Sequence, residues 1–289
     1  MATSWPCSQC SAGADMPEAD LFIAECSDNG LLDWHWHMVA AEKFQLTLTQ
    51  VERRALDLGI MPKRYQRNQA TITVDDQLKL FKSHVAVIGC GGLGCYIVEE
   101  LARAGIGTIT VIDPDVFEEH NLNRQLFSTM ANMGSAKVEV AASRVDSINP
   151  AVRLIPIQDS FNRANGSSLL HGADIAVDAL DNIATRLELS TVCKELAIPF
   201  VFGTVAGWYG QVSTLFPGDT LMHTMYPDST KEHGIEQQLG TPAFTPAVVA
   251  SIEAVEVCKF LLGKKQLLQG RSLTIDLLAM EVDQIETTA

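Results

Sequence analysis

A glycine-rich turn is the clearest chemical feature of this 289-residue chain. Residues 89–94 read Gly-Cys-Gly-Gly-Leu-Gly and follow the apolar run that ends at Ile88. Glycines allow a tight turn and let backbone N–H groups approach a phosphate at the start of the next helix. Asp113 ends the next apolar run, where a carboxylate can bind a ribose hydroxyl. The pattern predicts a site for an adenine nucleotide, which could be a dinucleotide or ATP.

Polar residues further along the chain distinguish between these two nucleotides. A dehydrogenase holds a pyrophosphate that must not react, whereas an adenylating enzyme must neutralise a triphosphate under attack. An exposed polar run supplies Asn121, Arg124 and Gln125, and Lys137 follows in the next predicted helix. Residues 178–182, Asp-Ala-Leu-Asp-Asn, end a later predicted parallel strand, where open α/β sheets bind ligands. An NAD-dependent oxidoreductase would leave these charges unused, so they favour ATP.

The order of the predicted elements indicates an α/β protein. Continuous apolar strands alternate with segments of helical spacing, and strands buried on both faces imply a parallel sheet. We therefore predict a doubly wound, mostly parallel, Rossmann-like sheet, continued by antiparallel strands and preceded by an N-terminal helical extension. The predicted strands cover 85–88, 108–112, 152–157, 175–178, 200–204, 209–216 and 272–278, the last closing the chain, and the predicted helices cover 93–104, 137–148, 183–196 and 246–262.

Residues 1–60 differ from the rest and are predicted to be an accessory N-terminal extension, followed by an ATP-binding adenylation domain over 61–289. Within the extension, 47–58 reads as a helix. Thr49 with Glu52 three residues later predicts a capping box at its start.

A second feature of the extension is a set of potential metal ligands. Cys7 and Cys10 with His35 and His37 could form a Cys2His2 zinc site if the two histidines lie on one side of a strand. The order and spacing match no common zinc finger. An N-terminal tail beside an aromatic packing patch is the favoured alternative.

Composition narrows the functional classes. The net charge of −14 would repel a phosphate backbone at long range, so a nucleic-acid substrate is not expected. No run of about 18 apolar residues and no secretory signal are present, which predicts a cytoplasmic protein without membrane insertion. The seven cysteines are odd in number and several lie in apolar contexts, as reduced, packed thiols do.

Four motifs in order resemble one known family. VIGCGGLG, DPDVFEEHNLNRQ, GSAKVE and DALDN are similar to the ThiF/MoeB/HesA family, relatives of the adenylation domain of ubiquitin-activating enzymes. The resemblance covers about Arg64 to Leu278. It implies a homodimeric adenylyltransferase that uses Mg-ATP. The expected substrate is the C-terminal glycine carboxylate of a small ubiquitin-fold sulfur carrier that ends in Gly-Gly, and pyrophosphate is released.

The same resemblance implies roles for individual residues. Lys137 resembles the lysine at the α-phosphate, and Asp181 resembles the magnesium ligand. Arg67 resembles an arginine that reaches into the partner protomer's site, and Arg124 belongs to the polyphosphate-binding set. The remaining nucleotide-binding candidates are Gly89, Gly91, Gly92, Gly94, Asp113 at the ribose, Asp115, Asn121, Gln125 and Asn182.

The sequence also departs from the family pattern. Two CxxC pairs that hold a structural zinc in most bacterial members are absent, so no zinc is expected at that site. No cysteine lies between Cys193 and Cys258, where relatives place a covalent nucleophile, and this favours adenylation without a persistent thioester. It also places a molybdopterin or tungstopterin carrier ahead of a thiamine carrier. A tRNA-modifying, ATP-dependent dehydratase of the same superfamily and a binding subunit that has lost its chemistry remain alternatives.

Overall fold

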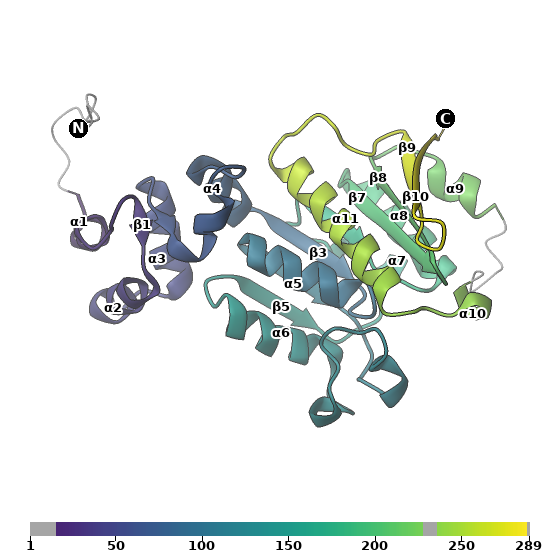
Figure 1. Cartoon of the computed structure of the whole chain (residues 1–289), viewed down its shortest axis with the longest axis horizontal. Coiled ribbons are helices and arrows are strands. Elements are labelled where there is room, and N and C mark those ends of the chain that lie inside the picture. The colour runs from purple at the N-terminus through teal and green to yellow at the C-terminus, as the bar shows by residue number, and fades with distance from the viewer. Residues whose placement is uncertain (1–15, 228–235, 288–289) are drawn as a thin grey trace.

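The computed structural model describes residues 16–227 and 236–287, which form an eight-stranded sheet covered by helices on both faces (Figure 1). A small helical unit lies beyond one end of the sheet (Figure 1). This architecture confirms the predicted α/β class. The strands in spatial order are β10 (Glu281–Glu286), β9 (Arg271–Asp276), β8 (Tyr209–Leu215), β7 (Phe200–Ala206), β6 (Ile175–Asp178), β3 (His84–Ile88), β4 (Thr108–Ile112) and β5 (Arg153–Ile157).

The sheet has a parallel and an antiparallel part. Strands β7, β6, β3, β4 and β5 pair in parallel, whereas β8, β9 and β10 pair antiparallel. The prediction that the strand near 272–278 closes the chain was wrong, because β9 turns back into β10. All six residues of β10 are exposed, so its sequence carries no burial alternation that could have revealed it.

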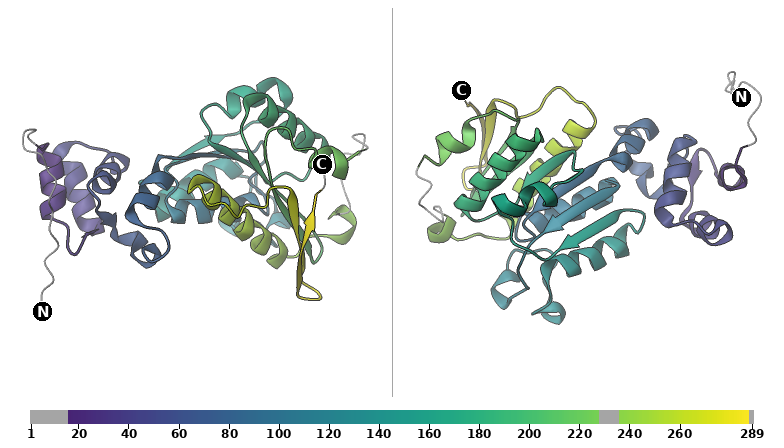
Figure 2. Two further views of the ribbon diagram at one scale, coloured as in Figure 1. Left: turned by 90° about the horizontal axis from the view of Figure 1, so that it is seen from above. Right: turned by 180° about the vertical axis from the view of Figure 1, so that it is seen from behind.

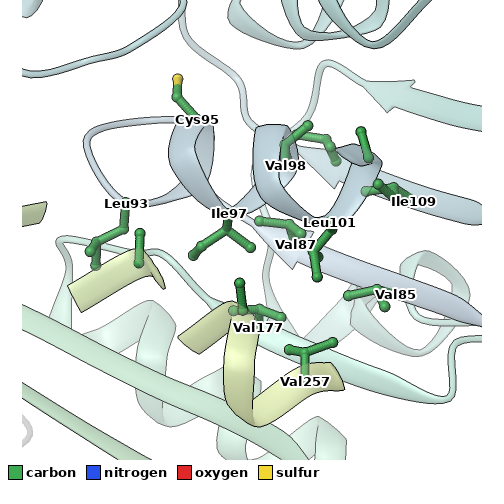
Figure 3. Packing of buried hydrophobic residues seen from close by; sticks show 14 of the residues in the cluster. Val85, Val87, Leu93, Cys95, Ile97, Val98, Leu101, Ile109, Val177 and Val257 are labelled. Atoms are coloured by element: carbon green, nitrogen blue, oxygen red, sulfur yellow. The ribbon is translucent and has the colours of Figure 1, made fainter. Parts of the chain in front are cut away.

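Helices cover the two faces of the sheet unequally (Figures 1 and 2). α5 (Gly94–Ala104), α6 (Lys137–Ile148) and α11 (Phe244–Leu261) pack on one face, while α7 (Arg163–Leu169) and α8 (Ile183–Leu196) pack on the other. Figure 3 shows the core of the first face, where Ile97 and Leu101 lie against Val85 and Val87 of β3 and Val257 comes from α11. These apolar contacts fix the strand ends at which the polar motifs emerge.

Several short helices connect these elements. The segment between β8 and α11 contains α9 (Leu221–Met225) and α10 (Glu236–Leu239). Two 3₁₀ turns, η2 (Glu119–Asn121) and η3 (Met130–Asn132), follow β4 and lead into α6.

The N-terminal unit has a hydrophobic core of its own, which includes Ile23, Leu32, Val51 and Ala55. Its elements in chain order are α1 (Glu18–Glu25), β1 (Leu31–Leu32), α2 (Trp34–Phe44), α3 (Leu48–Asp57), β2 (Met61–Pro62) and the 3₁₀ helix η1 (Lys63–Asn68), and α4 (Val74–Lys82) then leads into the sheet. The division of the chain at residue 60 stays a prediction.

The capping box of α3 differs from the predicted one. Thr47, not Thr49, caps the helix, and Gln50 completes the box. Thr49 instead donates its hydroxyl to the carbonyl oxygen of Ala151 at 2.9 Å. Glu52 is fully buried, where it accepts a hydrogen bond from Tyr65 at 2.8 Å. Of the two residues predicted as a cap, Thr49 therefore joins the N-terminal unit to the rest of the chain, and Glu52 belongs to the interior of the unit itself.

The strand assumed for the two histidines was wrong, because His35 and His37 lie in α2. Residues two apart on a helix point in nearly opposite directions. His35 is exposed, whereas His37 is buried and bonds the carbonyl oxygen of Leu48 through Nε2 at 2.8 Å. Cys7 and Cys10 lie outside the described residues.

Candidate nucleotide-binding site

A cavity of about 590 Å³ lies at the carboxyl ends of β3, β4 and β6. This is the edge at which parallel sheets collect their ligands. The cavity brings together ten of the residues predicted from the sequence: Gly89, Gly91, Gly92, Asp113, Asp115, Arg124, Gln125, Lys137, Asp181 and Asn182.

Three predicted residues do not line this cavity. A Cβ at Gly94 would collide with the carbonyl oxygen of Gly89, so this glycine serves the close packing of the loop. Asn121 is buried and accepts a hydrogen bond from the N–H of Glu118 at 2.9 Å, so its side chain holds the η2 turn. Arg67 is exposed in η1, outside the cavity of its own chain.

The glycine loop is held against the end of β6. Gly89 has a φ of +102°, and a Cβ there would collide with the carbonyl oxygen of Ala179. Gly91 and Gly92 face the cavity instead, with Gln125 and Arg124 close to them. Gly89 and Gly94 therefore shape the loop, whereas Gly91 and Gly92 leave open the backbone surface that a phosphate could approach.

Asp113 has an ordered carboxylate at the floor of the cavity. Its Oδ2 accepts a hydrogen bond from the N–H of Cys90 at 2.6 Å, and its Oδ1 accepts one from the N–H of Asp115 at 2.9 Å. Because these bonds come from the glycine loop and from the turn after β4, they fix the two walls of the cavity relative to each other.

Lys137 supplies a buried positive charge beside these acids. It is the first residue of α6, and its Nζ lies 2.8 Å from Asp115 Oδ2 and 3.7 Å from Asp113 Oδ1. Burial lowers the pKa of Lys137, but the two carboxylates outweigh burial and hold the pKa above its ordinary value. The ammonium group is therefore charged at neutral pH and can meet a phosphate.

Asp181 is an exposed carboxylate at the cavity wall, with no hydrogen bond or ion pair to the residues the structure describes. Its neighbour Asn182 caps α8 by accepting a hydrogen bond from the N–H of Thr185 at 3.0 Å. The described chain holds no group of three or more metal-ligating side chains. Mg²⁺ is commonly held by one or two carboxylates together with substrate phosphates and water. One accessible acid facing a phosphate-type loop fits that mode of binding.

Sequence reasoning missed Arg186, which lies on α8 and forms part of the cavity wall. Its Nε lies 2.9 Å from Asp178 Oδ2, and Nη1 donates to the hydroxyl of Tyr226 at 2.9 Å. Nη2 donates to the carbonyl oxygen of Leu180 at 2.5 Å, immediately before Asp181. Its signal in the sequence was an arginine in the first turn of the helix that Asn182 caps, but the fold is needed to show that the arginine is buried.

Glu253 lies on α11 behind this wall and was also missed. It is fully buried against Gly203, and neither carboxyl oxygen has a hydrogen-bond partner within the described chain. Burial and the nearby Asp178 raise the pKa of Glu253 well above its ordinary value, although Arg186 opposes this. The protonated form of the Glu253 carboxyl is therefore favoured in the folded chain.

No cysteine lines the cavity among the residues described. Burial raises the pKa of Cys193 to about 12 and that of Cys258 to about 11. Both thiols remain protonated at neutral pH, so they are packed side chains rather than nucleophiles.

The fold and the cavity together define a nucleotide-binding enzyme of the adenylating class. The family model for the ThiF family matches residues 65–289, and the chain belongs to this family. A SAMP-activating enzyme E1 of Haloferax volcanii is 33% identical over 226 residues, which cover 77% of this chain and 84% of that protein. The adenylyltransferase and sulfurtransferase MOCS3 of Aedes aegypti is 34% identical over 218 residues, and the match spans 74% of this chain but only half of the longer MOCS3.

Solved structures share the fold. E. coli tRNA N6-threonylcarbamoyladenosine dehydratase, TcdA, in complex with AMP has a TM-score of 0.61 and 25% identity, covering 70% of this chain and 95% of that chain. E. coli MccB with ATP has a TM-score of 0.64 and 21% identity, covering 93% of this chain and 86% of that chain. The MccB likeness is one of fold alone.

Proposed function

We propose that this enzyme adenylates the C-terminal carboxylate of a small ubiquitin-fold sulfur carrier with ATP. The supporting observation is the cavity that places the charged Lys137, the exposed Asp181 and an open glycine loop around one space. A dehydrogenase has no use for a lysine and a free acid at that place. The family and the similarity to a SAMP-activating E1 support the same choice.

The proposed reaction is a single displacement. A carboxylate oxygen of the carrier attacks the α-phosphorus of ATP, an acyl phosphate bond forms, and the bond to pyrophosphate breaks. Lys137 and Arg124 would stabilise the charge that develops on the phosphate oxygens. Asp181 would hold Mg²⁺, which neutralises the departing pyrophosphate. Asp113 would accept a hydrogen bond from the ribose with the lone pairs that its backbone partners leave free.

The carrier is proposed to be of the molybdopterin or tungstopterin type, with the thiamine type next, and to end in Gly-Gly. The MOCS3 relatives support this order, and the protonated Cys193 and Cys258 speak against a covalent thiol step. The test is intact-mass spectrometry of each carrier after incubation with enzyme, ATP and Mg²⁺. A carrier that gains one AMP group supports the proposal, and unmodified carriers of both types would contradict it.

A second candidate is favoured by one comparison. The TcdA structure in complex with AMP is 25% identical, and TcdA is a tRNA dehydratase. The net charge of −14 opposes binding of an RNA backbone. A mobility shift with total tRNA at low salt separates the two candidates, since only the dehydratase should retain the RNA.

We also propose that the protein is a homodimer in which Arg67 acts across the interface. Its exposure in η1, away from the cavity of its own chain, supports an action in trans. A guanidinium can bind two phosphate oxygens at once. By analogy with arginine fingers, loss of Arg67 should reduce the rate on the order of 10³-fold.

The test mixes inactive Arg67→Ala dimers with inactive Lys137→Ala dimers and lets the subunits exchange. One site of each heterodimer then combines an intact Arg67 with an intact Lys137, so activity should return. A mixture that stays inactive after mass spectrometry has confirmed exchange would show that Arg67 works within its own chain or only holds the fold.

A further inference from the structure

A second cavity of about 530 Å³ opens directly beside the nucleotide site. Both cavities are lined by Thr204, Val205 and Tyr226, so the two cavities adjoin each other at these residues. It lies over the antiparallel strands β8, β9 and β10, on the face opposite to the one that packs against α11. We call it the sheet groove.

The register of the strands builds the floor of the sheet groove from two rows of side chains. Each row crosses β7, β8, β9 and β10 in order, and every member lines the groove. The first row is Thr204, Gln211, Thr274 and Asp283, and the second row is Ala206, Tyr209, Asp276 and Glu281.

The charge of the sheet groove has one sign. Its far end carries Asp276, Glu281 and Asp283, and no basic side chain is among the described residues that line it. Asp276 uses Oδ1 to accept hydrogen bonds from the N–H groups of Leu278 and Ala279. Glu281 and Asp283 form no ion pair with the described residues and are exposed. The groove therefore offers two carboxylates to an incoming cation.

We infer that the sheet groove receives the tail of the carrier and selects a tail with a basic side chain. This inference rests on the proposed function, because the reacting carboxylate must lie in the adjoining nucleotide site. Three strand spacings of about 4.8 Å separate Thr204 from Asp283, or roughly 14 Å, which about four residues of extended chain span. The basic residue is thus placed roughly four residues before the part of the tail that lies at Thr204.

The closing experiment measures binding of pairs of fluorescent ten-residue peptides that end in Gly-Gly. In each pair one peptide carries lysine and the other carries glutamate at the same position, and the pairs cover the fourth to the seventh residue from the C-terminus. At one of these positions the full-length enzyme should bind the lysine peptide about tenfold more tightly, as two exposed ion pairs allow, and the preference should shrink in 0.5 M salt. Equal affinities at every position would overturn the inference.

Two double variants assign the effect to the groove. Glu281→Gln with Asp283→Asn removes both charges and should bring the two affinities within about twofold of each other. Glu286→Gln with Asp146→Asn removes two exposed charges outside the groove, on the other face of β10 and on α6, and should keep the preference. A preference that survives the first pair, or disappears with the second, would contradict the assignment.

Two further readouts separate this inference from its alternatives. If neither peptide supports pyrophosphate exchange while the binding preference persists, the result would count against adenylation of such tails. The assignment of the groove would still stand. If a second copy of the chain occupied the groove, the first double variant would change the sedimenting mass, and the peptides would show no preference. That result would overturn the inference.

Discussion

Two buried networks in this protein use the same three kinds of side chain. Each consists of a fully buried acid, an arginine that pairs with it and a tyrosine. One network lies near the amino ends of the parallel strands and the other lies at their carboxyl ends. The amino-end network is Glu52, Arg64 and Tyr65, and the carboxyl-end network is Asp178, Arg186 and Tyr226.

The two networks differ in what they contact. In the amino-end network, Tyr65 accepts a hydrogen bond from Asn149 at 2.8 Å and so ties the N-terminal unit to the end of α6. In the carboxyl-end network, Arg186 and Tyr226 line the nucleotide cavity. Burial raises the pKa of both Glu52 and Asp178. A perturbed acid therefore marks a functional site here only when it lies at the carboxyl edge of the parallel strands.

The largest expected effect comes from Arg186→Met, which leaves Asp178 buried without its partner. Removing one member of a buried ion pair costs about 3–5 kcal/mol. We expect the free energy of unfolding, measured by urea denaturation, to fall by that amount. The double variant Arg186→Met with Asp178→Asn should recover part of it, because no uncompensated charge remains. A loss below about 1 kcal/mol for the single variant would show that the pair is not buried as described.

His37 sets the pH response of the amino-end network. Burial lowers its pKa to about 4, from an ordinary value of 6.5. The unfolded chain therefore binds a proton that the folded chain rejects, so stability should fall as pH drops from about 6.5 towards 4. Over this pH window the free energy of unfolding should fall by roughly 3 kcal/mol. In His37→Gln, the thermal midpoint should depend less on pH in this window, and an unchanged slope would exclude His37 as the cause.

A matched pair of hydroxyl deletions sharpens the comparison between the networks. Tyr65→Phe leaves Glu52 and Asn149 short of a partner and should cost about 1–3 kcal/mol. We expect the pyrophosphate exchange rate per folded molecule to change less than twofold. Tyr226→Phe should cost less than about 1 kcal/mol in stability, since Tyr226 is only half-buried. It should raise the KM for the carrier severalfold. The reverse pattern would refute the division of roles.

The smallest effect is expected from Glu253→Gln near pH 4.5, the ordinary pKa of a glutamate carboxyl, because the unfolded wild-type chain also keeps much of its proton there. A carboxyl whose folded pKa is raised loses stability as pH rises above its unfolded pKa. The glutamine variant lacks this loss, so its stability relative to wild type should increase as the pH is raised from about 4.5 towards neutral. Thermal midpoints that run parallel over this range would show that Glu253 does not hold its proton.

The parts of the site that the sequence predicted are local in the chain. The glycine loop, Asp113 and Lys137 each follow a strand or begin a helix with a clear apolar pattern, so their edge of the sheet was predictable. Arg186 and Glu253 lie 67 positions apart on helices that pack on opposite faces of the sheet, and both contact Gly203 of β7. No local pattern shows that contact.

Two errors have a related cause. Glu52 matched the pattern of a helix cap, yet its partners Arg64 and Tyr65 come from a later turn and draw it into the interior. β10 is exposed throughout, so only its pairing with β9 defines it as a strand.

The most direct test of the central claim is carrier-dependent ATP–pyrophosphate exchange by Asp181→Ala. The residue is exposed and free of bonds to the described chain, so the variant should fold with an unchanged thermal midpoint. Without the proposed metal ligand, exchange should fall on the order of 10³-fold, equivalent to about 4 kcal/mol in the transition state. Asp146→Ala, at an exposed acid on α6, serves as the control and should exchange at the wild-type rate. Exchange by folded Asp181→Ala at the wild-type rate would contradict the account.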